Sequence, residues 1–173
     1  FCGARAFNQP VGACDVRSVT SFSRMFYGAS SFDSELEGWL LNGTEPIDMS
    51  YMFYNCVRFN KPLNHLGPRM RNVTNMRFMF HKCRRFDQPL GNWDVRNVRD
   101  MTRMFYECIE FNQDISGWNV GNVTNMSRML YGCESFNQSL EDWGTRVGNV
   151  QNMDDMLKYT LTLQHHRPTW LPI

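Results

Sequence analysis

A short phrase recurs along the whole chain and constrains its fold more than any other feature. A phenylalanine followed by Asn or Asp returns at nearly equal intervals, at Phe7, Phe32, Phe59, Phe86, Phe111 and Phe136. A period of about 25 residues is typical of repeat proteins, in which each unit is stabilised by its neighbours. The sequence therefore predicts about six stacked repeats over residues 1–163 and a capping tail at residues 164–173.

The clearest repeat, "FDQPLGNWDVRNVRDMTRMFYEC" from Phe86, shows which side chains are expected to point inward. Its apolar positions return one by one in the following repeat. The later set is Phe111, Ile115, Trp118, Val120, Val123, Met126, Met129, Leu130 and Cys133. Because the methionines follow this period, we interpret them as core residues and not as ligands of a metal or cofactor.

Two local structures are predicted within each repeat. The alternation in "ISGWNV", Ile115 to Val120, predicts a short strand, and one strand per repeat gives a parallel sheet. The M-x-x-M-F spacing predicts a short helical turn. Before it stand residues of the helix N-cap type, namely Ser21, Asp48, Asn75, Asp100, Asn125 and Asn152. The Asn or Asp after each repeat's phenylalanine predicts a tight turn in which its side chain bonds its own backbone. The predicted fold class is an α/β repeat solenoid.

The phrase "FNQDISGWNVGNVTNMSRMLYGC" closely resembles the BspA-like leucine-rich repeat family, found in many bacterial surface lipoproteins and in proteins of protists and large DNA viruses. The resemblance extends from Phe7 to about Leu163. It implies a right-handed leucine-rich-repeat-like solenoid that serves binding or adhesion without enzymatic activity. It also implies a location at the cell surface or outside the cell, or within a viral or other large particle.

Catalytic and cofactor chemistry is not predicted. The chain has no phosphate loop, no H-E-x-x-H and no G-x-S-x-G, and its four histidines have no repeated acid or nucleophile partner. We therefore expect no catalytic residue, no metal site and no cofactor. The adjacent His165 and His166 lack a third placed ligand. Cysteines at one repeat position predict a column of buried free thiols, formed by Cys56, Cys83, Cys108 and Cys133.

Charge is segregated along the chain although the net charge is only +1. Residues 69–106 hold eight Arg and one Lys against three acidic residues, a net charge of +6. Residues 107–155 hold eight acidic residues against two Arg, a net charge of −6. The repeat phase places equivalent positions in two columns just past the predicted strand, one with Arg17, Arg71 and Arg96 and one with Arg69, Asp94 and Asn119. These six residues are the candidate protein-binding site, although long arginines that simply extend into solvent would fit the same pattern.

The expected partner is a protein, acidic or glycan-bearing. Nucleic acid is not expected, because it favours a basic face interleaved with exposed aromatic residues, and the aromatic residues here are expected to point inward. No apolar run reaches the roughly 20 residues of a membrane helix. The chain is expected to start partway through a repeat, which would leave an open coil for head-to-tail or subunit contacts. Asn42, in an inserted loop, is the sequon expected to accept a glycan.

Two functions remain open at this point. The first is a surface or secreted recognition module. The second is a structural subunit packed into a large multiprotein assembly.

Overall fold

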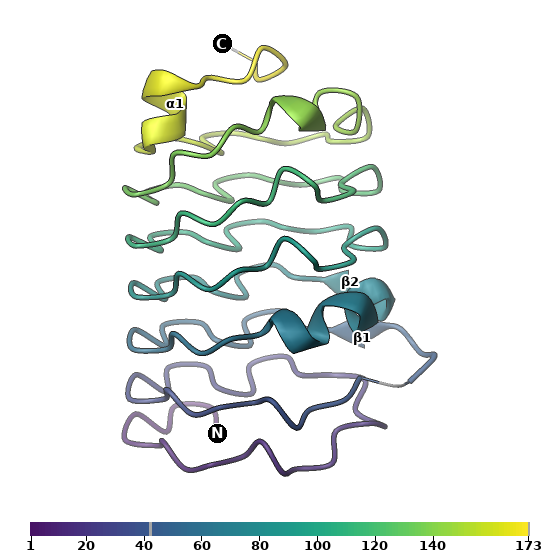
Figure 1. Cartoon of the computed structure of the whole chain (residues 1–173), viewed down its shortest axis with the longest axis vertical. Helices are drawn as coiled ribbons and strands as arrows, with labels where there is room; N and C mark the ends of the chain where they lie inside the picture. The colour runs from purple at the N-terminus through teal and green to yellow at the C-terminus, as the bar shows by residue number, and fades with distance from the viewer. Residues whose placement is uncertain (42, 173) are drawn as a thin grey trace.

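The computed structural model describes residues 1–41 and 43–172 and contains little regular secondary structure. Its elements are β1 (Ile47–Asp48), a 3-10 helix η1 (Asn64–Asn72), β2 (Val73–Asn75), a second 3-10 helix η2 (Glu141–Trp143) and α1 (Leu161–His165). β1 and β2 form a short parallel sheet. Successive turns of the chain lie above one another, from the N-terminal end at the bottom of Figure 1 to α1 at the top.

Parallel pairing joins each repeat to the next at a single column of residues. Isolated bridges link Ser21 to Asp48, Asn75 to Asp100, Asp100 to Asn125, and Asn125 to Asn152, and the β1–β2 pair completes the series. These are the residues that the sequence predicted as helix N-caps. Their side chains do accept a hydrogen bond from the backbone two residues later, as Asn125 Oδ1 does from Ser127 N at 2.9 Å.

The helical turn predicted for the M-x-x-M-F segment is wrong. In the fourth repeat the N–H groups of Met101, Arg103 and Phe105 donate to carbonyls of the fifth repeat at 2.8 to 3.0 Å. Of the N–H groups between them, Thr102 N donates to Asp100 Oδ1 at 2.8 Å and Met104 N closes a turn onto Met101 O at 3.1 Å. Arg103 has a φ of 51°, which a right-handed helix does not allow. Every second backbone donor is thus used to join repeats.

The strand predicted in Ile115 to Val120 is also absent, and the parallel pairing lies at Asn125 instead. The segment before it forms two turns, in which Trp118 N donates to Ile115 O at 3.1 Å and Val123 N to Val120 O at 3.0 Å. Apolar side chains at this spacing are buried by consecutive turns just as they would be by a strand. The sequence pattern therefore identified the buried residues correctly, but the backbone conformation predicted for them is wrong.

The core consists of columns of equivalent side chains, as the repeat predicted. Phe80 and Phe105 stack at 5.5 Å between ring centroids, and Phe111 and Phe136 stack at 5.9 Å. Pairs of this kind contribute about 0.5–1.5 kcal/mol each beyond the burial of their area. Tryptophan indoles bond across repeats as well, with Trp118 Nε1 donating to Leu90 O at 2.9 Å.

The predicted column of free thiols is confirmed, and each buried thiol donates a hydrogen bond to a core carbonyl of the preceding repeat. Cys108 Sγ donates to Phe80 O at 2.9 Å, and Cys133 Sγ donates to Phe105 O at 2.9 Å. Burial raises the pKa of Cys56 to about 12 and the pKa of Cys83 and Cys108 well above the usual range. These thiols are therefore protonated packing groups and not nucleophiles.

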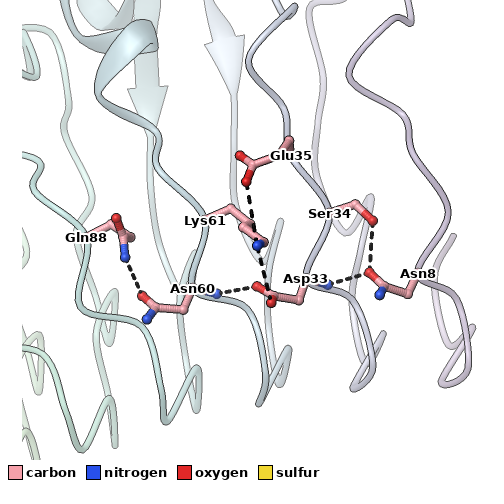
Figure 2. A network of polar contacts seen from close by, with 7 residues as sticks. All are labelled: Asn8, Asp33, Ser34, Glu35, Asn60, Lys61 and Gln88. Carbon is pink, nitrogen blue, oxygen red and sulfur yellow. Dashed lines mark hydrogen bonds and ion pairs between the residues drawn. The ribbon is translucent and has the colours of Figure 1, made fainter.

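The Asn or Asp after each core phenylalanine forms a ladder between repeats, and the prediction of a local turn at these residues is wrong. Asp33 N donates to Asn8 Oδ1 at 2.8 Å and Asn60 N donates to Asp33 Oδ1 at 2.9 Å (Figure 2). Asp87, Asn112 and Asn137 continue the series. Each of these side chains except that of Asn137, the last in the series, therefore supplies the acceptor for the backbone of the repeat above it.

The C-terminal residues pack on the last repeat. Thr162 N, in α1, donates to Phe136 O at 2.9 Å. Trp170 Nε1 donates to Leu140 O at 2.9 Å, and its ring lies 6.4 Å from that of Trp143. Trp170 thus adds a further member to the tryptophan column.

The Asn ladder generates a test of this account. We predict that Asn112→Ala lowers the free energy of unfolding by about 1–3 kcal/mol, because the N–H of Asn137 loses its acceptor. Asn112→Asp keeps the Oδ1 acceptor and serves as the control, with a smaller loss. Urea unfolding followed by circular dichroism measures both. Equal losses in the two variants would show that the ladder bond is not what stabilises this position.

Candidate functional site

Arg71 lies where two shallow hollows of the surface adjoin. One, of about 320 Å³, is lined by Arg71 and Arg99 together with neutral side chains such as Asn97. The other, of about 300 Å³, is lined by Arg71 and Arg69. The structure therefore gathers two of the predicted arginines, Arg69 and Arg71, and adds Arg99, which the sequence argument did not select.

Asparagine amides hold the backbone of this region in place. Asn97 Nδ2 donates to Arg71 O at 2.7 Å, and Asn122 Nδ2 donates to Arg96 O at 2.7 Å. These bonds join equivalent positions of successive repeats, so Arg71 and Arg96 do occupy one column. Asn72 and Asn122 also begin N-x-S/T sequons, and both side chains take part in this series, since Asn72 Nδ2 donates to Gly43 O. Asn42 lies outside the described residues.

The predicted site residues differ in whether their charges are neutralised by an ion-pair partner. Arg96 Nε lies 2.7 Å from Asp94 Oδ1, and Arg17 Nη2 lies 2.7 Å from Asp15 Oδ2. The hydrogen bonds from Arg17 lower the pKa of Asp15 to about 2. Arg96 and Arg17 are therefore locally neutralised. Asn119 Oδ1 accepts from Gly121 N at 3.2 Å and closes a turn.

Arg69, Arg71 and Arg99 have no ion-pair partner among residues 1–41 and 43–172. Stacking the repeats thus leaves three unneutralised guanidinium groups around the two hollows. Such a surface attracts carboxylates or other anions. In the part of the chain that is described, no three His, Cys, Asp or Glu side chains are grouped so that they could hold a metal ion.

A second group of surface residues was missed by the sequence argument, which expected the aromatic residues to point inward. The residue after each of the first five "MF" or "ML" pairs carries an aromatic ring and is half-buried or, in one case, buried, whereas Lys158 after the sixth pair is exposed. We call this column the tyrosine ladder, formed by Tyr27, Tyr54, His81, Tyr106 and Tyr131. The recurrent letter Y in "MFY" and "MLY" was the signal that could have revealed it.

Rings of the ladder stack face to face along the repeats. Centroid distances are 4.5 Å between Tyr27 and Tyr54 and 4.8 Å between Tyr106 and Tyr131, with interplanar angles of 4° and 1°. This spacing matches the separation of paired strands, about 4.8 Å, because backbone pairing sets the distance between repeats. The ring faces are therefore covered by neighbouring rings.

His81 occupies the middle of the ladder, where its neighbours carry tyrosine. Its ring lies 4.5 Å from that of Tyr54 and 4.6 Å from that of Tyr106. The side chain is buried and its Nδ1 has no hydrogen-bond partner among the described residues. Burial, helped by the positive charges of Lys82 and Arg103, lowers the pKa of His81 to about 4. The imidazole is therefore neutral in the folded protein at pH 7.

Comparison with known families agrees with the repeat character of this surface. The family model described as "Mycoplasma protein of unknown function, DUF285" matches residues 1–67 and again residues 66–170. The chain belongs to this family. Comparison with curated proteins and with solved structures finds no match. None of the helices in the described part of this DUF285 chain has the length and apolar character needed to cross a membrane.

The position of His81 in the DUF285 chain predicts a pH-dependent stability. The unfolded chain binds a proton at His81 near the ordinary histidine pKa of 6.5, whereas the folded chain binds it only near a pKa of about 4. Stability is therefore lost as the pH falls from 6.5 to 4, by up to about 3 kcal/mol.

We predict that His81→Tyr removes the loss of stability that protonation of His81 causes between pH 6.5 and pH 4. Tyrosine fits the ladder and does not titrate in this pH range. Urea unfolding at pH 7 and pH 4 measures the change for both proteins. The difference in stability between variant and wild type should grow as the pH falls. A difference that stays constant would contradict the assignment.

Proposed function

We propose that this DUF285 chain is a non-enzymatic protein-binding module built as a right-handed solenoid of the leucine-rich-repeat type. Three observations support it: the regular period of the sequence, the stacked turns joined by parallel pairing (Figure 1), and the resemblance to BspA-like repeats. Two successive family matches along one chain also fit a repeat protein. The resemblance further supports a surface or secreted recognition role.

The observation that carries this proposal is the position of Arg71 between the two hollows, together with Arg69 and Arg99. These charges have no partner among the described residues, and hydrogen-bonded backbone holds their positions. An acidic or glycan-bearing protein that places carboxylates in the hollows would form charge-assisted hydrogen bonds there. Such complementarity gives specificity and fast association.

A second candidate function is a structural subunit of a large assembly. The opposed net charges of residues 69–106 and 107–155, +6 and −6, favour it, because the basic part of one subunit would attract the acidic part of the next. This function predicts association of the purified chain at low salt. A monodisperse monomer across a salt titration would count against it.

The recognition function is tested by Arg71→Glu combined with Arg96→Glu. Cross-linking in the native source identifies the protein that lies against this face, and calorimetry then measures its affinity for the purified chain. We predict a loss of about tenfold or more in the double variant, without unfolding. Arg71→Glu alone should account for most of the loss, because Arg96 is already paired with Asp94.

Arg17→Glu provides the matched control, because Arg17 is paired with Asp15 but does not line either hollow. Its affinity should stay close to that of the wild type. An unchanged affinity in the Arg71→Glu, Arg96→Glu variant would exclude this face as the binding site.

A further inference from the structure

Beside the tyrosine ladder lies a second column in which arginines and aromatic rings touch. We call it the arginine–aromatic stripe and define it by Arg24, Tyr51, Arg77, Phe78, Arg103 and Tyr106, of which Tyr106 also belongs to the ladder. These residues come from the first four repeats, and each is exposed or half-buried. None of the residues of the stripe lines either of the Arg71 hollows.

The guanidinium groups of the stripe are held over aromatic rings. The Cζ atom of Arg24 lies 5.1 Å from the ring centroid of Tyr51. Arg77 Cζ lies 5.5 Å from the ring centroids of both Tyr51 and Phe78. Arg103 Cζ lies 5.4 Å from the ring of Phe78 and 5.6 Å from that of Tyr106. Cation–π contacts of this kind fix a long side chain and leave N–H groups at its edge available. One N–H group of Arg77 is already used, because its Nη2 donates to the Tyr51 hydroxyl at 3.2 Å.

The charges of these arginines are not neutralised. Within residues 1–41 and 43–172, none of Arg24, Arg77 and Arg103 forms an ion pair with a carboxylate. The next arginine of the same column, Arg128, differs, because its Nε lies 3.3 Å from Asp155 Oδ2. The stripe therefore ends in a neutralised arginine, and its free positive charge is confined to the first four repeats.

The stacking in this region excludes ligands that bind by inserting a flat ring. Tyr51 and Phe78 stack at 4.7 Å with an interplanar angle of 9°, and the rings of Tyr54 and His81 stack at 4.5 Å. A nucleic-acid base or a sugar ring needs an open aromatic face. The faces here are occupied by neighbouring rings and by guanidinium groups. What the stripe offers is a row of N–H donors bordered by apolar ring edges and a tyrosine hydroxyl.

We propose that the arginine–aromatic stripe is a docking surface for an acidic segment of a partner protein. Carboxylates of that segment accept forked hydrogen bonds from Arg24 and Arg103 and a further hydrogen bond from Arg77, and its apolar atoms cover the adjoining ring edges. The planar guanidinium fork matches the planar carboxylate. Tyr and Arg are also among the residues most enriched in the energetic centres of protein interfaces. This surface is additional to the Arg71 hollows and does not depend on their function.

Fluorescence anisotropy of a labelled poly-glutamate peptide, titrated with the intact chain at low salt, tests the proposal. The test variant replaces Arg24, Arg77 and Arg103 by Gln. The matched control replaces Arg58, Arg84 and Arg85 by Gln and so removes the same charge from a different edge, where these residues line a hollow of their own. We expect the stripe variant to lose about tenfold or more in affinity and the control to change by less than about threefold.

Two further variants keep the test decisive. The stripe variant should lose the same factor in affinity in an Arg71→Gln, Arg99→Gln background as in the wild-type background, which separates the stripe from the hollows of the proposed function. Arg77→Lys with Arg103→Lys keeps the charge but loses the fork, and should reproduce part of the loss in a protein whose charge is unchanged. If the triple Gln variant does not fold, the lysine variant still tests whether the peptide binds through the guanidinium groups of the stripe.

Four results would overturn the proposal. Equal losses in the stripe variant and the control would mean that the peptide responds only to net charge. Loss of binding in the Arg71→Gln, Arg99→Gln variant alone would place the peptide in the hollows. Heparin or oligo(dT) binding more tightly than poly-glutamate, with the same dependence on the stripe, would assign the surface to a sulfate or phosphate polymer. A concentration-dependent dimer lost only in the stripe variant would assign it to a second copy of the chain.

Discussion

The backbone bonds between neighbouring repeats are the interaction on which the rest of this structure depends. In every segment of the M-x-x-M-F type except the last, every second N–H group donates to the repeat above, as Arg103 N does to Ser127 O at 3.0 Å. The intervening N–H groups close turns within their own repeat. These backbone donors are satisfied without a helix or a long strand, which meets the general requirement for buried backbone groups. The energetic cost is a left-handed conformation at residues such as Arg103 and Glu107, with φ values of 51° and 54°.

This pairing fixes the register of the repeats, and the register creates every column of side chains. Equivalent residues lie directly above one another, so phenylalanines stack in the core and Cys108 meets the carbonyl of Phe80. The same register places tyrosines in face-to-face contact at the surface and holds guanidinium groups over rings. Both candidate binding surfaces are therefore consequences of the stacking. A single repeat in isolation would position neither of them.

The sequence predicted what is buried far better than how the backbone runs. Met101, Trp118 and Cys133 follow the period, and burial of periodic apolar residues does not depend on the exact dihedral angles. Apolar residues at i, i+3 and i+4 fit either a helix or a series of turns, so the spacing could not exclude the turns found at Met101 to Phe105. The left-handed conformation of Arg103 could not be predicted from its residue type, because glycine and asparagine are the residues that usually adopt it.

The candidate site was predicted in part for similar reasons. Arg69 and Arg71 were found because they share a repeat phase with other residues, but the pairing of Arg96 with Asp94 was overlooked although "DVR" places them two positions apart. Asn112 was expected to bond its own backbone. The sequence does not show that the backbone of the next repeat lies within hydrogen-bond distance of the Asn112 side chain. Tyr106 was expected to be buried because aromatic residues usually fill cores, whereas here the ladder covers its faces and leaves it half-buried.

A pair of deletions tests most directly whether register between repeats specifies this fold. Removing residues 112–136 takes out one whole repeat and joins Phe111 to Asn137 in register. Removing residues 112–124 takes out only about half of that segment and leaves a partial turn. The account predicts that the larger deletion still unfolds cooperatively in urea with lower stability, and that the smaller one loses cooperative unfolding. A smaller deletion that is the more stable of the two would contradict it.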